Sequence, residues 1–557
     1  MLTAVVSAAT LAPPVAAVAP PPAPTIVAEP GVQECATPQE PTSCPENPHA
    51  GRSFTFKAVA TPGLTLAYNF QGPTGGDSGR VAADASGTTT LPPYRADEGL
   101  HRLVVQAIDS SGVPSPDSTY AFLVGPIRPT GLWTLDEQSG ESAASTGSVP
   151  APLTLGPAAG WSARGRLAGA IRFDGRGYGP ATAGPAVIDT TKSFSVAAWV
   201  RLDKEASLAT VFSSPGQNVS ALSVWWDRAD GKWRAGRYPK DASSSKQSIA
   251  SVSGRPSGVW SHVAATYDRA TNKMRLFVNG RPQGTLKFSG TPWAGTGLWV
   301  GCDKWSGRAF RCMRASVDDL RVYQTVLPSA DIATLAAPRV NDNPVAAAAG
   351  RWRMEDPAAA GQAADEVFDG ALTLNGVQGD AFSAGALVVG PSGAASASTP
   401  KPVIDSTGAY TVKVDVAIND VSAPQVVARQ AGTNTDAWSL AFVPTDSGPV
   451  WRFSRPFADS VSADVTVAEW RAEAPLAVNT LVVTYDAAGT LRFYENGAPV
   501  RKDGESFEVT VGTPWIARGG VVLGSGTVAG TPAPMTGTIH DFALYAGQMS
   551  ENDILNG

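Results

Sequence analysis

Apolar and polar residues alternate with a period of two through most of the chain, which is the pattern of half-buried β-strands. The segment SFSVAAWVRL at 193–202 places the apolar residues Phe194, Val196, Ala198 and Val200 at every second position. Another segment, MRLFVN, leads into Asn279-Gly280, a dipeptide typical of a two-residue hairpin turn. Helical spacing is confined to PSADIATLAA at 328–337. The chain is therefore expected to be all-β.

The same succession of segments occurs twice. The matching pairs are 187–202 with 403–418, 266–282 with 484–499, 290–293 with 512–515, and 317–323 with 539–545. The offset between partners drifts only from 216 to 222 residues, which indicates two tandem domains. We expect a feature that both copies share to be structural. A feature of one copy alone is a candidate for function.

The composition of the chain changes along its length and predicts five parts. Residues 1–47 are rich in Ala and Pro without periodicity, so we expect a disordered, export-related arm. Residues 48–126 hold short alternating segments between turn residues, typical of an immunoglobulin-like β-sandwich. The first repeat follows at 127–338, a linker at 339–350 and the second, divergent repeat at 351–557. Each repeat is expected to be a two-sheet antiparallel sandwich of about 12–14 strands closed by one short helix.

The overall composition fits this prediction and excludes some functions. Gly (57) and Pro (45) are abundant among the 557 residues and charged residues make up only 17%, which favours turn-rich β structure. A hydrophobic content of 43% excludes a wholly disordered chain. The net charge of −6 is mild and we find no cluster of Lys and Arg, so nucleic acid is not an expected partner.

The four cysteines fall into two close pairs, Cys35 with Cys44 and Cys302 with Cys312. Two local disulfides formed in an oxidising compartment are the simplest interpretation. Free thiols or a zinc site are the alternatives, but CxxC spacing and nearby histidines are both missing.

The first twenty residues, MLTAVVSAATLAPPVAAVAP, are apolar, yet no Lys or Arg precedes Arg52 as a signal peptide requires. Pro13 and Pro14 interrupt this segment too early for a membrane span, and no other stretch approaches that length. We expect a secreted or cell-surface protein whose export signal is incomplete or begins upstream.

Several segments of the first repeat together resemble a laminin-G-like, concanavalin-A-like jelly-roll domain of secreted actinobacterial proteins. They are WTLDEQSG (133–140), AIRFDG (170–175), SFSVAAWVRL (193–202), WSHVAATYD (260–268), MRLFVNG (274–280) and VDDLRVYQTVLPSADI (317–332). The second repeat keeps most of them, but ALVVGPSG at 386–393 replaces the Phe-Asp-Gly element. In the small domain, VVQAIDSSGVPSP at 104–116 resembles the penultimate strand and turn of bacterial immunoglobulin-like domains. The jelly-roll resemblance implies non-catalytic modules that bind glycans or protein ligands, often with calcium on the sandwich rim.

The resemblance also implies a set of carboxylates for calcium, which prefers several oxygen ligands. In the first repeat these are Glu137, Asp174, Asp318 and Asp319. The alternative is structural, because Asp in turns commonly caps backbone N–H groups. In the second repeat Glu355 and Asp541 remain, but His540 stands at the position of Asp318 and no carboxylate replaces Asp174. Calcium is therefore the only cofactor considered, and in the first repeat.

Catalysis is not expected. The paired-carboxylate spacings ExDxxE and ExDxE of glycosidases with this fold do not occur, and neither does GxSxG. Only four histidines are present, and His262 lies in a predicted strand where the second repeat has Thr480. We interpret it as a strand-surface histidine. A glycosidase with an unusual carboxylate arrangement is the alternative.

Comparison of the two repeats separates tryptophans expected to pack in the core from those that are candidates for ligand binding. Those that open each copy or lie in the shared GTPW motif are expected to be packing anchors: Trp133, Trp352, Trp293 and Trp515. Val224 and Trp226 are apolar in both copies and are assigned to the core, which leaves Trp225 on the opposite, exposed face. Trp305 lies in the loop CDKWSGRAFRC between the second cysteine pair, for which we find no counterpart in the second repeat.

This disulfide-tied loop is the predicted ligand-binding site. The disulfide already restricts its conformation in the free protein, so little conformational entropy is lost when a ligand binds. The candidate residues are Trp225, Tyr238, Asp303, Lys304, Trp305 and Arg308. Alternatively, Trp305 folds back over the sandwich edge as a plug. We expect an extracellular binding protein for a carbohydrate or cell-envelope glycan. A structural or adhesive surface protein without a specific ligand, or an ancillary part of a larger secreted enzyme or toxin, remains an alternative.

Overall fold

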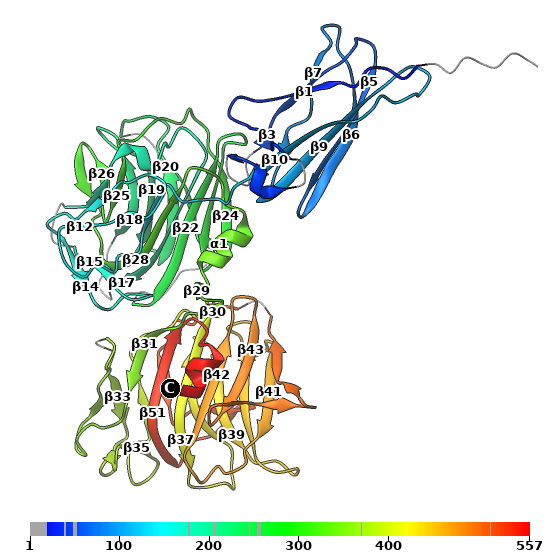
Figure 1. The fold of residues 1–557 in the computed structure, drawn as a ribbon. Helices are drawn as coiled ribbons and strands as arrows, with labels where there is room; N and C mark the ends of the chain where they lie inside the picture. The colour runs from blue at the N-terminus through cyan, green and yellow to red at the C-terminus, as the bar shows by residue number, and fades with distance from the viewer. Residues whose placement is uncertain are drawn as a thin grey trace, which may run out of the picture. The chain divides into compact units, whose positions relative to one another are not determined.

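The computed structural model shows an almost purely β protein that divides into two compact units, Met1–Arg128 and Pro129–Gly557 (Figure 1). It describes residues 19–37, 40–47, 53–175, 179–203, 208–243, 246–252, 258–368, 370–512 and 514–556. Residues 1–18 of the predicted arm lie outside these ranges. In the described parts, the α-helices are α1 (Ser329–Leu335) and α2 (Glu551–Asn556), and neither they nor any other described helix is long and apolar enough to span a membrane. The all-β prediction is confirmed.

The first unit is a small sandwich. Its sheets are β1 (Thr25–Ala28), β4 (Phe56–Val59) and β7 (Thr88–Thr90), and β2 (Glu46–Asn47), β10 (Ser118–Val124), β9 (Gly99–Ile108), β5 (Thr65–Gly72) and β6 (Gly75–Ala82), with the pair β3 (Ser53–Phe54) and β8 (Tyr94–Arg95). Phe54, Phe56, Phe70 and Phe122 are fully buried between them. β1 and β2 both precede residue 48, so the prediction that the chain is disordered to residue 47 is wrong for these segments. β1 pairs with β4 and completes a sheet edge.

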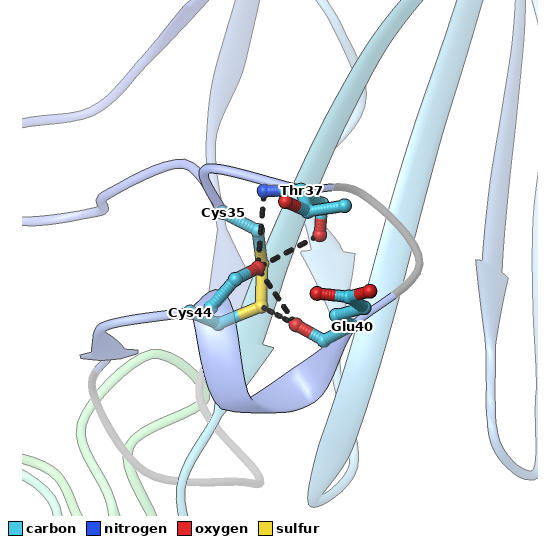
Figure 2. Close-up of a disulfide and its surroundings, with 5 residues drawn as sticks. Cys35, Thr37, Glu40 and Cys44 are labelled. Carbon is cyan, nitrogen blue, oxygen red and sulfur yellow. Dashed lines mark hydrogen bonds between the residues drawn. A yellow bond between two sulfur atoms is a disulfide. The ribbon is translucent and has the colours of Figure 1, made fainter.

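The predicted disulfide between Cys35 and Cys44 is confirmed and closes a short loop in this unit (Figure 2). A 3₁₀ turn, Pro41–Ser43, lies inside the loop, and the Ser43 hydroxyl donates to the carbonyl oxygens of Thr37 and Glu40 at 2.9 and 2.8 Å. The backbone N–H of Cys35 donates to the carbonyl of Ala121 in β10 at 2.8 Å. The loop is therefore attached to the sheet at its first cysteine.

The first jelly roll packs two antiparallel sheets face to face. The β17 sheet has the order β14 (Ala159–Ser162), β15 (Ala170–Asp174), β28 (Arg314–Tyr323), β17 (Phe194–Leu202), β22 (Trp260–Asp268), β23 (Lys273–Val278) and β24 (Arg281–Lys287), with β11 (Gly131–Trp133) on β28. The β19 sheet has the order β12 (Ser142–Ala143), β13 (Leu153–Thr154), β16 (Ala181–Ala183), β25 (Leu298–Val300), β18 (Ala209–Pro215), β19 (Ser220–Asp227), β20 (Lys232–Arg237) and β21 (Gln247–Ala250). A separate hairpin consists of β26 (Asp303–Trp305) and β27 (Arg308–Phe310), and a 3₁₀ turn spans Pro185–Val187.

The second jelly roll repeats this arrangement. The β37 sheet has the order β34 (Phe382–Ser383), β35 (Ala386–Val389), β51 (Gly537–Ala546), β37 (Tyr410–Ile418), β42 (Asn479–Tyr485), β43 (Thr490–Glu495) and β44 (Ala498–Pro499), with β31 (Ala347–Trp352) on β51 and β47 (Glu508–Thr510) on β43. The β39 sheet has the order β32 (Gln362–Ala363), β33 (Leu372–Asn375), β36 (Ser396–Ser398), β48 (Val521–Leu523), β38 (Gln425–Ala431), β39 (Asp436–Val443), β40 (Val450–Pro456) and β41 (Val465–Arg471). Two further hairpins are β45 (Arg501–Lys502) with β46 (Glu505–Ser506) and β49 (Thr527–Val528) with β50 (Thr531–Pro532).

The predicted linker is shorter than expected. β31 begins at Ala347 and pairs with β51, so the alanines before Gly350 belong to the second jelly roll. Between the jelly rolls the chain forms a small hairpin of β29 (Arg339–Val340) and β30 (Asn343–Pro344). In the divergent region, β35 takes the place of β15 beside the last long strand, so the loss of the Phe-Asp-Gly element leaves the sheet intact.

Two local predictions are confirmed in both copies. Asn279 and Gly280 have φ values of 49° and 75°, and Asn496 and Gly497 have 51° and 80°, so each pair forms the positive-φ turn of a tight hairpin. The predicted short helix is α1 in the first copy, where it packs on β24 (Figure 1), and α2 in the second.

The four tryptophans shared by the copies are packing anchors, as expected. Trp133 and Trp352 are fully buried and donate through Nε1 to the carbonyls of Ala151 and Gly370, each at 3.1 Å. Nε1 of Trp293 donates to the carbonyl of Tyr238 and that of Trp515 to the carbonyl of Pro456, each at 2.9 Å. The equivalent bonds show that these rings serve the fold.

Replacing Trp133 with Phe removes the indole N–H and leaves the Ala151 carbonyl without this donor. We expect the first jelly roll to lose about 1–3 kcal/mol of unfolding free energy, measured by denaturant titration. The partly exposed Trp305→Phe is the matched control and should leave the free energy unchanged. Equal stability of Trp133→Phe and the wild type would contradict the anchor role.

Candidate ligand-binding site

The β26–β27 hairpin lies across the outer face of the β19 sheet. Ser223 and Trp225 point to this face, because Val224 and Trp226 are part of the core. The predicted disulfide between Cys302 and Cys312 is confirmed and closes the base of the hairpin. Backbone and hydroxyl bonds attach it to the sheet: Ser213 Oγ to the Cys302 carbonyl (2.8 Å), Thr210 N to the Arg311 carbonyl (3.0 Å) and Gly307 N to the Asn218 carbonyl (3.0 Å). The hairpin is therefore held at both strands and at its tip.

A buried ion pair of Asp303 and Lys246 lies under the hairpin. The Lys246 ammonium is 2.8 Å from Asp303 Oδ2 and donates to Ser223 Oγ at 2.9 Å. Asp303 Oδ1 accepts from Ser223 Oγ at 2.8 Å and from the Lys304 backbone N–H at 2.9 Å. Burial opposes ionisation of Asp303, but Lys246 and the serine hydroxyls hold the pKa of this carboxyl below its ordinary value. The pair thus joins the hairpin to the segment before β21.

Two aromatic rings form the exposed surface of the hairpin. Trp305 is 37% exposed and Phe310 is 38% exposed, and their ring centroids lie 6.4 Å apart. Tyr238, from the loop after β20, lies 5.9 Å from Trp305 and is itself buried. We call Trp305, Phe310 and Tyr238 the aromatic platform.

Trp225 is not exposed, so that prediction is wrong. Its ring is 4% exposed, because the Lys246 ammonium and the Arg311 guanidinium lie over it at 4.7 and 5.3 Å from the ring centroid. Such cation–π contacts are favourable when water is excluded. Trp225 therefore supports the site from below and does not form its surface.

The structure brings all six predicted ligand-binding residues to the hairpin and its support. Lys304 donates from Nζ to the Gly216 carbonyl at 2.7 Å and lies over Trp299, whereas Arg308 is exposed and pairs with Trp305 in the hairpin register. Sequence reasoning missed Lys246, Phe310 and Arg311. The latter two lie inside the same disulfide loop and could have been found by the same criterion.

The second copy does have a counterpart of the hairpin, contrary to our expectation. β49 and β50 follow β48 just as β26 and β27 follow β25. The counterpart segment, SGTVAGTPA at 525–533, contains no cysteine, aromatic ring or charge. Ala441 replaces Trp225, and a groove of about 810 Å³ lined by Ala441, Ser439 and Arg452 lies over this face. The hairpin itself is thus structural, and its aromatic and charged residues are the candidate functional features.

The four carboxylates proposed for calcium do not form one cluster. Glu137 Oε1 accepts from the Ala144 backbone at 2.7 Å, and Asp318 is buried and accepts from the backbone of Arg166 and Leu167 at 2.6 and 2.8 Å. Asp319 pairs with Arg321 at 3.0 Å. Asp174 lies opposite Arg314, four residues along β28 from Asp318, a separation of about 13 Å. Across the described ranges, no group of three or more His, Cys, Asp or Glu side chains is arranged to hold a metal. Calcium binding stays a prediction.

His262 lies in a strand, but the prediction that it is on the surface is wrong. It is 2% exposed and packs edge-on against Trp199, with ring centroids 5.4 Å apart. Burial, together with the charges of Arg321 and Arg166, lowers the pKa of His262 to about 3. The imidazole is therefore neutral at physiological pH.

Comparison with known families gives one strong match. The family model described as the Concanavalin A-like lectin/glucanases superfamily matches residues 174–333 and 391–555, which together exceed half of the chain. No curated protein is significantly similar in sequence.

Several solved structures are similar in fold. One is domain 4 of the GH43 extracellular arabinanase AbnA from Geobacillus stearothermophilus in complex with arabinotriose, which is 18% identical; the match covers 38% of this chain and 98% of that chain with a TM-score of 0.30. Another is the native heptameric SAP-like pentraxin from Limulus polyphemus, which is 20% identical; the match covers 27% of this chain and 74% of that chain with a TM-score of 0.23. A third is the CBM40 of the Ruminococcus gnavus IT-sialidase, which is 15% identical; the match covers 26% of this chain and 84% of that chain with a TM-score of 0.24. At these identities the likeness concerns the fold alone.

The ion pair beneath the hairpin can be tested by a double-mutant cycle. Asp303→Asn leaves the Lys246 ammonium buried without its anion, and Lys246→Met leaves the carboxylate without its cation. We expect each to lower the unfolding free energy of the first jelly roll by about 3–5 kcal/mol. The double variant should lose less than the sum, measured by denaturant unfolding. Strict additivity would contradict the coupling.

The same pair predicts a pH dependence. Because the folded-state pKa of Asp303 is lowered, its stabilisation is complete above the unfolded value of about 3.9 and is lost as the pH falls through the folded pKa. The stability difference between the wild type and Asp303→Asn should therefore shrink in acid.

The calcium prediction can be tested by unfolding the chain with millimolar calcium and with EDTA. Only a ligand bound to the folded state raises the melting temperature, so calcium held by Glu137, Asp318 and Asp319 should raise it above the value in EDTA, and Asp318→Asn should abolish the rise. Equal melting temperatures in calcium and EDTA would contradict the calcium prediction.

Proposed function

The chain belongs to the concanavalin A-like lectin/glucanases superfamily, and from this premise we propose that its first jelly roll is a non-catalytic, extracellular module that binds a carbohydrate. The observation that carries the proposal is the aromatic platform. Trp305 and Phe310 are exposed on a disulfide-closed hairpin whose counterpart in the second jelly roll folds without any ring.

Exposed aromatic rings suit sugar recognition because the C–H faces of a sugar ring are apolar and its hydroxyls are polar. A flat ring buries the apolar face, and polar groups around it bond the hydroxyls. Arg308, which is exposed beside Trp305 in the hairpin, is placed to serve as such a polar group.

The hairpin is also ordered before a ligand binds. Its disulfide, the bonds to Ser213 and Thr210, and the Asp303–Lys246 pair fix the backbone that carries the rings. Less conformational entropy is then lost on binding, so that a modest contact area still gives measurable affinity.

An extracellular location is part of the proposal, and the two disulfides support it because they persist mainly in oxidising compartments. The second jelly roll, which lacks the platform, serves as a spacer in this scheme.

The proposal is tested on a glycan array with the full chain, followed by affinity measurement for the best glycan. The double variant Trp305→Ala with Phe310→Ala should weaken binding at least about tenfold, because centrally placed aromatic anchors dominate such contacts. Phe457→Ala, which removes a 44% exposed ring of the second jelly roll, is the matched control and should bind normally. An array without any bound glycan, or a double variant with unchanged affinity, would overturn the proposal.

A further inference from the structure

The hairpin that carries the aromatic platform is strongly cationic. The segment 302–312 contains Lys304, Arg308 and Arg311 and a single acid, Asp303. Lys246 neutralises that acid in the buried ion pair at 2.8 Å. The hairpin therefore carries a net positive charge around the platform, although the whole chain has a net charge of −6.

Among these cations, Arg311 contacts two aromatic rings and lacks a hydrogen-bond partner at a buried nitrogen. Its guanidinium lies over the rings of Phe310 and Trp225, 5.1 and 5.3 Å from their centroids. In the described part of the chain, no hydrogen bond or ion pair engages this guanidinium, and its Nε is buried without a partner. A partly buried arginine that lacks an acceptor is unfavourable, and an oxyanion is the acceptor that its planar donors fit best.

Of the other two cations, Arg308 lies beside the rings as the cross-strand partner of Trp305. Lys304 lies over Trp299 instead and donates to the Gly216 carbonyl. The nearby acid Asp241 is already committed, because its carboxylate accepts the backbone N–H groups of Gln217, Asn218 and Val219. Its charge interacts with that of Lys304, but in the described part of the chain no ion pair joins Asp241 to Arg308 or Arg311.

The second copy shows that these charges are not needed to build the hairpin. Its counterpart, 525–533, forms the β49–β50 hairpin without a charged residue or a ring. Rings and cations thus occur together in one copy and are absent together from the other. This joint occurrence is expected of a surface whose rings stack on a sugar ring while its cations bind a charged group of the same ligand.

We infer that the ligand is an anionic glycan, whose sugar ring stacks on Trp305 and Phe310 while its carboxylate or sulfate group binds Arg311 and Arg308. The inference rests on the proposed function and adds the ligand class. An acidic chain repels a polyanion over most of its surface, so the cationic hairpin also directs the ligand to the platform.

The test compares glycans that differ only in charge, using the full chain and isothermal titration calorimetry. Oligogalacturonate is paired with its methyl-esterified form to probe a carboxylate, and dextran sulfate with dextran to probe a sulfate. We expect at least one anionic member to bind about tenfold more tightly than its neutral partner in low salt, and the preference to fall as salt is added. The pair that shows the preference identifies the anionic group.

Variants separate the charge from the rings. Arg311→Gln with Arg308→Gln should reduce the preference to less than about twofold, because the positive charges that distinguish the anionic from the neutral partner are then missing. Arg501→Gln, which removes an exposed arginine of the second jelly roll, is the matched control and should keep the preference. Circular dichroism and the melting temperature check that each variant folds.

The outcomes distinguish this inference from the proposed function. Equal affinity for charged and neutral partners, lost in Trp305→Ala, overturns the anionic ligand and keeps the carbohydrate site. A preference for the anion that survives in Arg311→Gln with Arg308→Gln also overturns the inference. Anion binding that is unaffected by Trp305→Ala with Phe310→Ala overturns the proposed function, because the rings then take no part.

Discussion

The face-to-face packing of two antiparallel sheets is the constraint on which both jelly rolls depend. Alternate side chains of the central strands are buried between the sheets, and a buried arginine in each copy ties this core to the loop before the first long strand. Arg237 donates to the Thr190 carbonyl and lies 4.2 Å from the Tyr267 ring, and Arg455 donates to the Ser406 carbonyl and lies 4.5 Å from the Tyr485 ring. Since packing leaves so little room for change, the two copies retain the same interior.

The outer face of the β19 sheet is free of this constraint, and there the copies differ. Both place a hairpin over the outer face and attach it through a backbone bond, from Thr210 to the Arg311 carbonyl in the first copy and from Val426 to the Ala533 carbonyl in the second. Only the first copy adds a disulfide, a buried ion pair and exposed rings to it. The disulfide and the ion pair fix the hairpin, so residues that contribute nothing to the core can still keep defined positions.

Most of the fold could be predicted from the sequence, because periodicity, Asn-Gly turns and close cysteine pairs are local signals. Burial on an outer face is not local. Trp225 is covered by Lys246 and Arg311, which lie outside its own strand, and the alternation of β19 says only that it faces away from the core. The β49–β50 hairpin was missed because Gly, Thr and Ala carry no side-chain signal, and β1 because its four residues pair with a strand thirty residues away. The candidate site was found through Trp305, yet its supporting cation was not.

That supporting cation, Lys246, has two consequences for the site. Its bond to Asp303 at 2.8 Å holds the hairpin on the sheet. The same bond cancels the single negative charge of the hairpin, and its ammonium lies 4.7 and 4.8 Å from the rings of Trp225 and Tyr238, which keeps both rings in place beneath Trp305. The Lys246 side chain thus determines both the position of the platform and the net charge around it. A change at Lys246 would therefore disturb the attachment of the hairpin and the electrostatic character of the surface together, whereas a change at Arg311 removes a positive charge without breaking the bond to Asp303.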